Sequence, residues 1–126
     1  MFFVKSFSTK GLNIGMSVNY LVFYRGRAND QQAFVDRYRD EHVPILKRFP
    51  DIQGISFLTP VEWQDKYPVN PGQFMLIVQM KFATIEALEI ALQSTARDEA
   101  REDFKKFSAF GGEIWHQAMK QEDQLE

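Results

Sequence analysis

The chain has 126 residues, of which 44% are hydrophobic and 25% charged, and this composition favours one globular domain with a real core. Its 15 basic and 17 acidic side chains give a net charge of −2, which lacks the basic footprint of a nucleic-acid-binding protein. The absence of cysteine excludes disulfides, thiolate metal sites and a cysteine nucleophile, and it is compatible with a cytoplasmic location.

The sequence also indicates how the chain is divided. No apolar run approaches the roughly 18 residues that span a bilayer, so we do not expect a membrane as a partner. The net charge gives no reason to expect a nucleic acid either. Lys5 and Lys10 interrupt the apolar residues of the first segment, which therefore lacks the core of a secretory signal. We expect an N-terminal extension over residues 1–15, one domain over 16–120, and a polar tail over 121–126.

The first predicted strand covers residues 18–24, which are rich in β-branched and aromatic residues and contain no breaker. Both of its faces are mostly apolar, which is typical of a central strand. Asn29 or Asp30 can cap the helix that follows, because a short side-chain oxygen accepts a hydrogen bond from a free N–H group of the first turn.

The helix that follows has one apolar face, and a histidine lies near its middle. At about 100° per residue, one arc of about 120° holds Phe34, Val35, Tyr38, His42, Ile45, Leu46 and Phe49. Pro44 has no N–H group and its ring crowds the carbonyl of Asp40, so we expect a kink or a restart of the helix near His42. The helix therefore directs an imidazole toward whatever its apolar face covers.

A long loop is expected after the second strand. Residues 55–61 are predicted as this strand, and Pro60 makes it an edge strand or ends it. Residues 62–73 then form a loop, and loops of this length are often lids or binding loops. Trp63 and Tyr67 are large amphipathic side chains in it, and we expect them to contact a ligand as part of a lid.

The second half repeats the pattern of strand, helix and strand. We expect a strand, two helices and a strand over residues 74–82, 85–94, 96–107 and 113–119, respectively. Thr84 is the predicted cap of the first of these helices. In the strand over residues 74–82, Phe74 is expected to share a face with Leu76. In the second helix, Asp103 is expected to point into water, and Gly111 and Gly112 are expected to break the chain before the last strand.

This βαββαβ order predicts a ferredoxin-like α+β sandwich with an antiparallel four-stranded sheet. Helices can cover only one face of such a sheet, and the strands would leave the other face apolar. Because an exposed apolar patch of this size is unfavourable for a monomer, we expect a homodimer with the two sheets packed face to face.

Short motifs add a family resemblance. Glu41-His42-Val43-Pro44 is followed by a turn with Phe49-Pro50 and Gly54, and Trp115-His116 lies in the last strand. With these motifs, the chain resembles the EthD family of dimeric α+β barrel proteins over roughly residues 17–119. The resemblance implies a homodimer of ferredoxin-like folds with an apolar pocket between sheet and helices. Members of the family are associated with the degradation or tailoring of small organic molecules.

His42 is the candidate catalytic residue. A histidine with an ordinary pKa near ~6.5 suits a general acid or base at the mouth of a pocket. The structural alternative is a buried histidine that ties the kinked helix to a nearby carbonyl. The neighbouring Asp40 and Glu41 point away from the direction of His42, so no carboxylate that would orient the ring is evident within the helix.

Tyr20, Tyr38 and Tyr67 are candidate ligand contacts through their hydroxyl groups, although amphipathic tyrosines also occur at the edge of a core. His116 is a further candidate, and its side chain can face either the cavity or the dimer interface. The two histidines lack the spacing of a metal site, and glycine-rich nucleotide motifs are absent, so we predict no metal and no cofactor.

Three classes of function remain. The first is a cofactor-free enzyme, either a proton-transfer enzyme (isomerase or cyclase) or an oxygenase, that acts on a small aromatic or carbonyl-bearing compound. The second is an accessory protein that binds such a compound in a degradation or tailoring pathway. The third is a non-catalytic dimeric binding or structural module.

Overall fold

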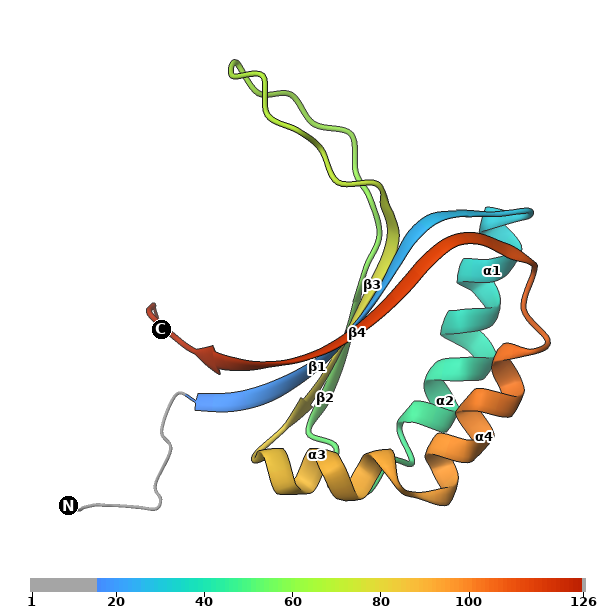
Figure 1. The fold of residues 1–126 in the computed structure, drawn as a ribbon, viewed down its shortest axis with the longest axis vertical. Coiled ribbons are helices and arrows are strands. Elements are labelled where there is room, and N and C mark those ends of the chain that lie inside the picture. The colour runs from blue at the N-terminus through green and yellow to red at the C-terminus, as the bar shows by residue number, and fades with distance from the viewer. Residues whose placement is uncertain (1–15, 126) are drawn as a thin grey trace.

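Four antiparallel strands form one sheet in residues 16–125, the range that this computed structural model describes (Figure 1). The strands are β1 (Met16–Ala28), β2 (Gly54–Leu58), β3 (Phe74–Phe82) and β4 (Phe110–Glu122). Their order in the sheet is β2-β3-β1-β4, with β1 and β3 in the centre. The predicted βαββαβ sandwich is confirmed, and the predicted extension over residues 1–15 lies outside the described range.

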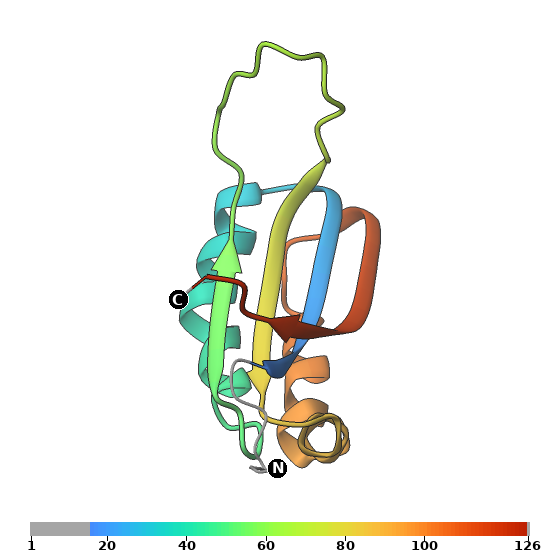
Figure 2. The same ribbon diagram turned by 90° about the vertical axis from the view of Figure 1, so that its left-hand side faces the viewer.

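The helices of residues 16–125 all lie against one face of this sheet (Figure 1). They are α1 (Gln31–Arg37), the π-helical turn η1 (Tyr38–His42), α2 (Val43–Leu46), α3 (Ile85–Leu92) and α4 (Thr95–Phe104). Figure 2 shows the sheet from its other side, with the helices behind it. None of the helices within residues 16–125 has the length and apolarity that crossing a bilayer requires.

Three of the helices, α1, α3 and α4, begin directly after a side chain that caps their first turn. Asp30 accepts a hydrogen bond from the N–H of Ala33, and Thr84 accepts one from the N–H of Ala87, as the sequence predicts. Ser94 caps α4 in the same way, through the N–H of Arg97. Each cap satisfies a donor that the helix itself leaves free.

The irregularity expected beside His42 is present as a π-helical turn. The N–H of Val43 bonds to the carbonyl of Tyr38, five residues earlier, and α2 starts at Val43. Pro44 has no N–H for an ordinary α-helical bond, which explains the break in the pattern at this point. Single π-helical turns inside helices occur frequently at functional sites.

The core lies between the helices and the covered face of the sheet. Its largest fully buried side chains come from α1, η1, β3 and α3, and they are Phe34, Tyr38, Leu76, Val78, Phe82 and Leu88. One packing prediction is wrong, because Phe74 contacts Phe23 and Trp115 on the open face instead of following Leu76 inward. The register of β1 and β3 shifts between Tyr24 and Arg25, and this bulge reverses the alternation beyond it.

The last strand is longer than predicted at both ends. Gly111 and Gly112 do not break the chain; instead, Gly112 pairs with Gly26 of β1, and both have positive φ values, of 145° and 135°. A β-carbon at Gly26 would lie 2.3 Å from the carbonyl oxygen of Gly111, so only glycine allows this close approach. At the other end β4 runs to Glu122, where the sequence predicts the polar tail to have begun.

The segment between β2 and β3 is the long loop that the sequence predicts, and it starts after Leu58, two residues before Pro60. Figures 1 and 2 show that this loop extends well beyond the end of the sheet, away from the helices. Its two aromatic side chains, Trp63 and Tyr67, are 57% and 65% exposed. The loop therefore adds no side chain to the core of the described chain.

Candidate functional site

A cavity of about 680 Å³ lies between the covered face of the sheet and the helices η1, α2 and α4. Its volume is within the range of about 300–1,000 Å³ that is typical of small-molecule sites. The wall formed by the sheet and η1 is largely aliphatic and aromatic, and α4 contributes most of the charged groups. An apolar cavity with a few polar groups on one side suits a small amphipathic organic compound.

His42 lies in the wall of this cavity. The π-helical turn carries it, and its side chain is only 7% exposed. The ring packs against Tyr38 and Phe107, with ring centroids 4.7 and 5.2 Å away. These contacts leave the imidazole little freedom to change its rotamer.

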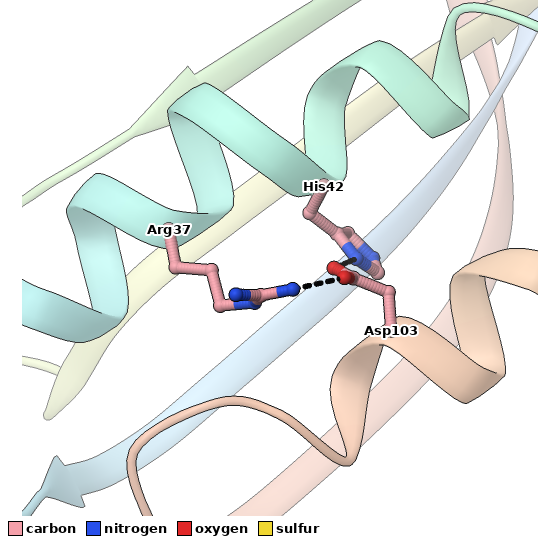
Figure 3. A network of polar contacts seen from close by, with 3 residues as sticks. All are labelled: Arg37, His42 and Asp103. Atoms are coloured by element: carbon pink, nitrogen blue, oxygen red, sulfur yellow. Dashed lines mark hydrogen bonds and ion pairs between the residues drawn. The ribbon is translucent and has the colours of Figure 1, made fainter.

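A carboxylate from another helix holds the ring in place (Figure 3). His42 Nδ1 lies 3.0 Å from Oδ2 of Asp103 in α4, and Arg37 in α1 pairs with the other oxygen of that carboxylate. Because an ionised carboxylate only accepts hydrogen bonds, Nδ1 carries the proton in this contact. Nε2 then has a free lone pair, and within residues 16–125 its ring makes no hydrogen bond other than the one to Asp103.

The prediction that Asp103 points into water is wrong, because this residue is only 7% exposed. A signal for its burial is present in the sequence. Asp103 follows Ala96 and Ala100 at helical spacing, and both of these alanines are buried. Asp103 therefore lies on the buried side of α4, where this helix approaches η1. Its carboxylate is the orienting partner of His42 that Asp40 and Glu41 do not provide.

Burial and charge set the protonation states of this group. Burial lowers the pKa of His42 below its ordinary value of 6.5, and Arg37 contributes to the lowering, although the hydrogen bond and charge of Asp103 oppose it. Burial alone would raise the pKa of Asp103, but the hydrogen bonds from His42 and Arg37, together with the charge of Arg37, lower it below 3.8. At neutral pH the site therefore holds an uncharged imidazole beside an ionised carboxylate.

Tyr38 also lines the cavity, and its phenol is fully buried beside that of Tyr24. Burial raises the pKa of Tyr24 to about 12, and it raises the pKa of Tyr38 well above 10.0. Both phenols therefore stay protonated at physiological pH and act as hydrogen-bonding groups, not as bases.

The structure places His116 on the covered face of the sheet, where it pairs with Val22 across β1 and β4. Its ring lines the same cavity as His42, and its Nδ1 lies 2.7 Å from the hydroxyl of Tyr20. Burial lowers the pKa of His116, and the positive charges of Arg97 and Arg101 lower it further. Tyr20 and His116 thus form a second polar group in the cavity.

Four of the six predicted site residues, Tyr20, Tyr38, His42 and His116, are brought together around one cavity. Trp63 and Tyr67 are not among the residues that line it, and a ligand contact by either remains a prediction. Asp103, which contacts His42, and Arg37, which pairs with Asp103, are the side chains of this candidate site that the sequence analysis missed. Within residues 16–125 no three His, Cys, Asp or Glu side chains are arranged to hold a metal ion.

Comparison with known proteins shows a match to the model of the EthD domain over residues 27–111. No curated protein matches the chain. Among solved structures, an ethyl tert-butyl ether D (EthD) family protein from Bacillus halodurans C-125 is similar, with a TM-score of 0.66 and 21% identity. The similarity covers 82% of this chain and 96% of that protein.

Two further solved structures share the fold. A hydroxynitrile lyase from Passiflora edulis has a TM-score of 0.62 and 14% identity, over 87% of this chain and 97% of its own. A dimeric ferredoxin-like protein of unknown function from Thermobifida fusca YX has a TM-score of 0.57 and 10% identity, over 86% of this chain and 92% of its own. The predicted ferredoxin-like fold of the dimeric α+β barrel proteins is thereby confirmed.

Proposed function

Since this chain belongs to the EthD family, we propose that it binds a small aromatic or carbonyl-bearing compound in the cavity and that His42 transfers a proton on that compound. The observation that carries this proposal is the hydrogen bond of 3.0 Å between His42 and the buried Asp103, in the wall of an apolar cavity. It fixes the tautomer in which Nε2 is the basic atom.

The arrangement has the properties of a general base. A base must be unprotonated at the working pH, and the lowered pKa of His42 meets this condition near pH 7. When Nε2 takes a proton, the imidazolium that forms lies against the ionised Asp103, which stabilises it. The same imidazolium can return the proton to another atom of the bound compound, as an isomerisation or an elimination requires.

The other polar group of the cavity gives the substrate an orientation. The hydroxyl of Tyr20 and the imidazole of His116 are hydrogen-bonded to each other, at 2.7 Å, in the same cavity. A substrate carbonyl that accepts a hydrogen bond from this pair becomes more acid at the adjacent carbon, because the developing enolate oxygen is stabilised. We assign Tyr20 and His116 to this binding role.

Proton exchange in D₂O tests the proposal without knowledge of the natural substrate. Aryl ketones and aromatic hydroxynitriles are suitable probes, and NMR detects deuterium at the carbon beside the carbonyl or release of an aldehyde. For a probe that reacts, His42→Ala is expected to lower kcat/KM by about 100-fold or more. Added imidazole is expected to restore part of the rate, because it can enter the space left beside Asp103.

A matched pair of variants on α4 provides the control. Asp103→Asn removes the orienting charge and is expected to lower the rate by about tenfold or more, whereas Glu99→Gln makes the same chemical change at an exposed residue of the same helix. An unchanged rate in His42→Ala would contradict the role of His42. If the wild-type protein binds the probes and exchanges no proton, the site is a binding site instead of a catalytic one.

We also propose that the protein is a homodimer through the open face of its sheet. That face carries exposed apolar side chains, including Trp115 and Met119, which are 45% and 48% exposed. The similar protein from Thermobifida fusca YX is described as dimeric, which supports the same assembly. Light scattering at micromolar concentration is expected to give twice the mass of 14.7 kDa, and the mass of a monomer would contradict the proposal.

A further inference from the structure

One wall of the cavity is a row of positive charges on α4. Arg97, Arg101 and Lys105, the last of which follows the helix directly, are spaced four residues apart. Side chains at this spacing lie on the same side of a helix. All three line the cavity, so the row faces the space that also contains His42 and His116.

The row is only partly neutralised. Lys105 pairs with Glu102 at 2.9 Å, and Glu102 is the one carboxylate in the described lining. Within residues 16–125, the side chain of Arg97 has only a long contact, of 3.5 Å, to the carbonyl of Leu92, and the side chain of Arg101 makes neither an ion pair nor a hydrogen bond. Three cations against one carboxylate leave an excess of two positive charges at the cavity.

Asp103 does not cancel this excess. Both of its oxygens are occupied, one by His42 and the other by Arg37, and Arg37 does not line the cavity. The whole chain has a net charge of −2, so a positive wall in the cavity is a local feature and not a consequence of composition. The positive charge acts on His116, since Arg97 and Arg101 both lower its pKa, after burial as the main cause.

We infer that the compound bound in this cavity is an aromatic carboxylate or a similar aromatic oxyanion, held at its charged end by Arg101 and Arg97. A guanidinium group binds a carboxylate through two parallel N–H···O bonds, which makes arginine well suited to this contact. The apolar body of the compound lies against the wall of the sheet. The inference rests on the proposed use of the cavity as a ligand site and names the class of compound that the site takes.

A pair of ligands with the same shape and different charge tests the inference. The probes are 2-naphthoate and its neutral analogue 2-naphthamide, and isothermal titration calorimetry at low ionic strength measures their Kd. The wild-type protein is expected to bind the carboxylate about tenfold or more tightly than the amide. Added salt is expected to reduce the preference, since part of it is electrostatic.

Arginine variants locate the contact. Arg101→Gln is expected to remove most of the preference for naphthoate and to leave the Kd of naphthamide within about twofold. Arg27→Gln is the control, because it removes the same charge from an exposed arginine of β1 that does not line the cavity. In wild-type protein, bound naphthoate is also expected to raise the pKa of His116, measured by NMR, because it neutralises the two arginines that lower it.

The outcomes separate this inference from the proposed proton transfer. His42→Ala is expected to lose proton transfer and to keep the preference for naphthoate, since His42 does not contact the charged end. Equal binding of the two probes, binding of neither, or an unchanged preference in Arg101→Gln would each overturn the inference. None of these three results bears on whether His42 exchanges a proton on a neutral ketone.

Discussion

The two faces of the sheet are built from alternate residues of the same strands, yet they differ in what covers them. In β1, Val22 and Tyr24 are 4% exposed beneath the helices, whereas Leu21 and Phe23 face the other way. The covered face has packed aromatic rings, a cavity and a paired carboxylate. The open face has exposed apolar side chains such as Trp115, and no helix of residues 16–125 covers it, although the end of β4 crosses in front of the sheet (Figure 2).

This difference shows how one strand sequence serves two purposes. Successive side chains of a strand point to opposite faces of the sheet, and here both faces carry apolar residues. The helices cover only one of these faces. On the covered face, hydrogen-bonding partners offset the cost of burying the Asp103 carboxylate, which pairs with Arg37 and His42. The open face needs a second molecule for the same burial, so association is the expected consequence.

The largest expected effect comes from a core truncation on the covered face. Leu76→Ala is expected to lower the free energy of unfolding by about 3 kcal/mol, because Leu76 is fully buried beneath the helices. Ile77→Ala, at the next residue and on the opposite face, is expected to cost about 1 kcal/mol in dilute, monomeric protein. Urea denaturation measures both variants, and equal losses would contradict the contrast between the two faces.

The buried carboxylate gives the next largest effect. Asp103→Ala is expected to cost about 2 kcal/mol, below the usual 3–5 kcal/mol for breaking a buried pair, because the side chain of Arg37 is 28% exposed and can reach water. Glu99 lies on the same helix as Asp103, and Glu99→Ala, which breaks its exposed pair with Arg48, is expected to cost about 0.5 kcal/mol or less. Thermal unfolding of the two variants separates these values.

The pH dependence of stability tests the same network. The pKa of His42 is lowered by folding, so the unfolded chain binds more protons as the pH falls through 6.5, and stability falls with it. Asp103, whose pKa is lowered below 3.8, adds stability that is lost at still lower pH. His116 changes stability in the same direction as His42.

We therefore expect the unfolding free energy of the wild-type protein to decrease between about pH 8 and pH 5, and that of His42→Gln to decrease less. Urea denaturation at a series of pH values measures the two slopes. Identical slopes would show that His42 keeps an ordinary pKa in the folded protein.

The smallest effect on the monomer is expected on the open face. Trp115→Ser is expected to change the unfolding free energy of the monomer by about 1 kcal/mol or less, because Trp115 is 45% exposed. The proposed dimerisation is expected to make the Tm of the wild-type protein rise with protein concentration, and this rise is expected to disappear in the variant. Trp63→Ser is the matched control, since Trp63 lies in the projecting loop and is 57% exposed.

Much of the fold and part of the site are predictable from local patterns. The positions of Asp30 and Thr84 mark helix starts because a cap acts on its own first turn. Pro44 marks the irregular turn because its missing N–H affects the carbonyl one turn back. His42 is predictable as an inward-facing imidazole because the helical period places it on the same arc as Tyr38.

Other features depend on contacts between distant residues. The β-bulge that turns Phe74 to the open face arises from pairing between β1 and β3, and the direction of His116 follows from its register with Val22. No local pattern specifies which residue of one strand lies opposite which residue of another.

The order of the elements and the place of His42 on the inner side of its helix follow from the sequence alone, because they depend on chain periods of a few residues. The contact that orients this histidine comes from Asp103, 61 residues further along the chain, and it exists only in the folded protein. Folding also brings the arginines of α4 to the same cavity. Such contacts between distant residues depend on how α4 packs against η1, and packing is a property of the whole folded chain.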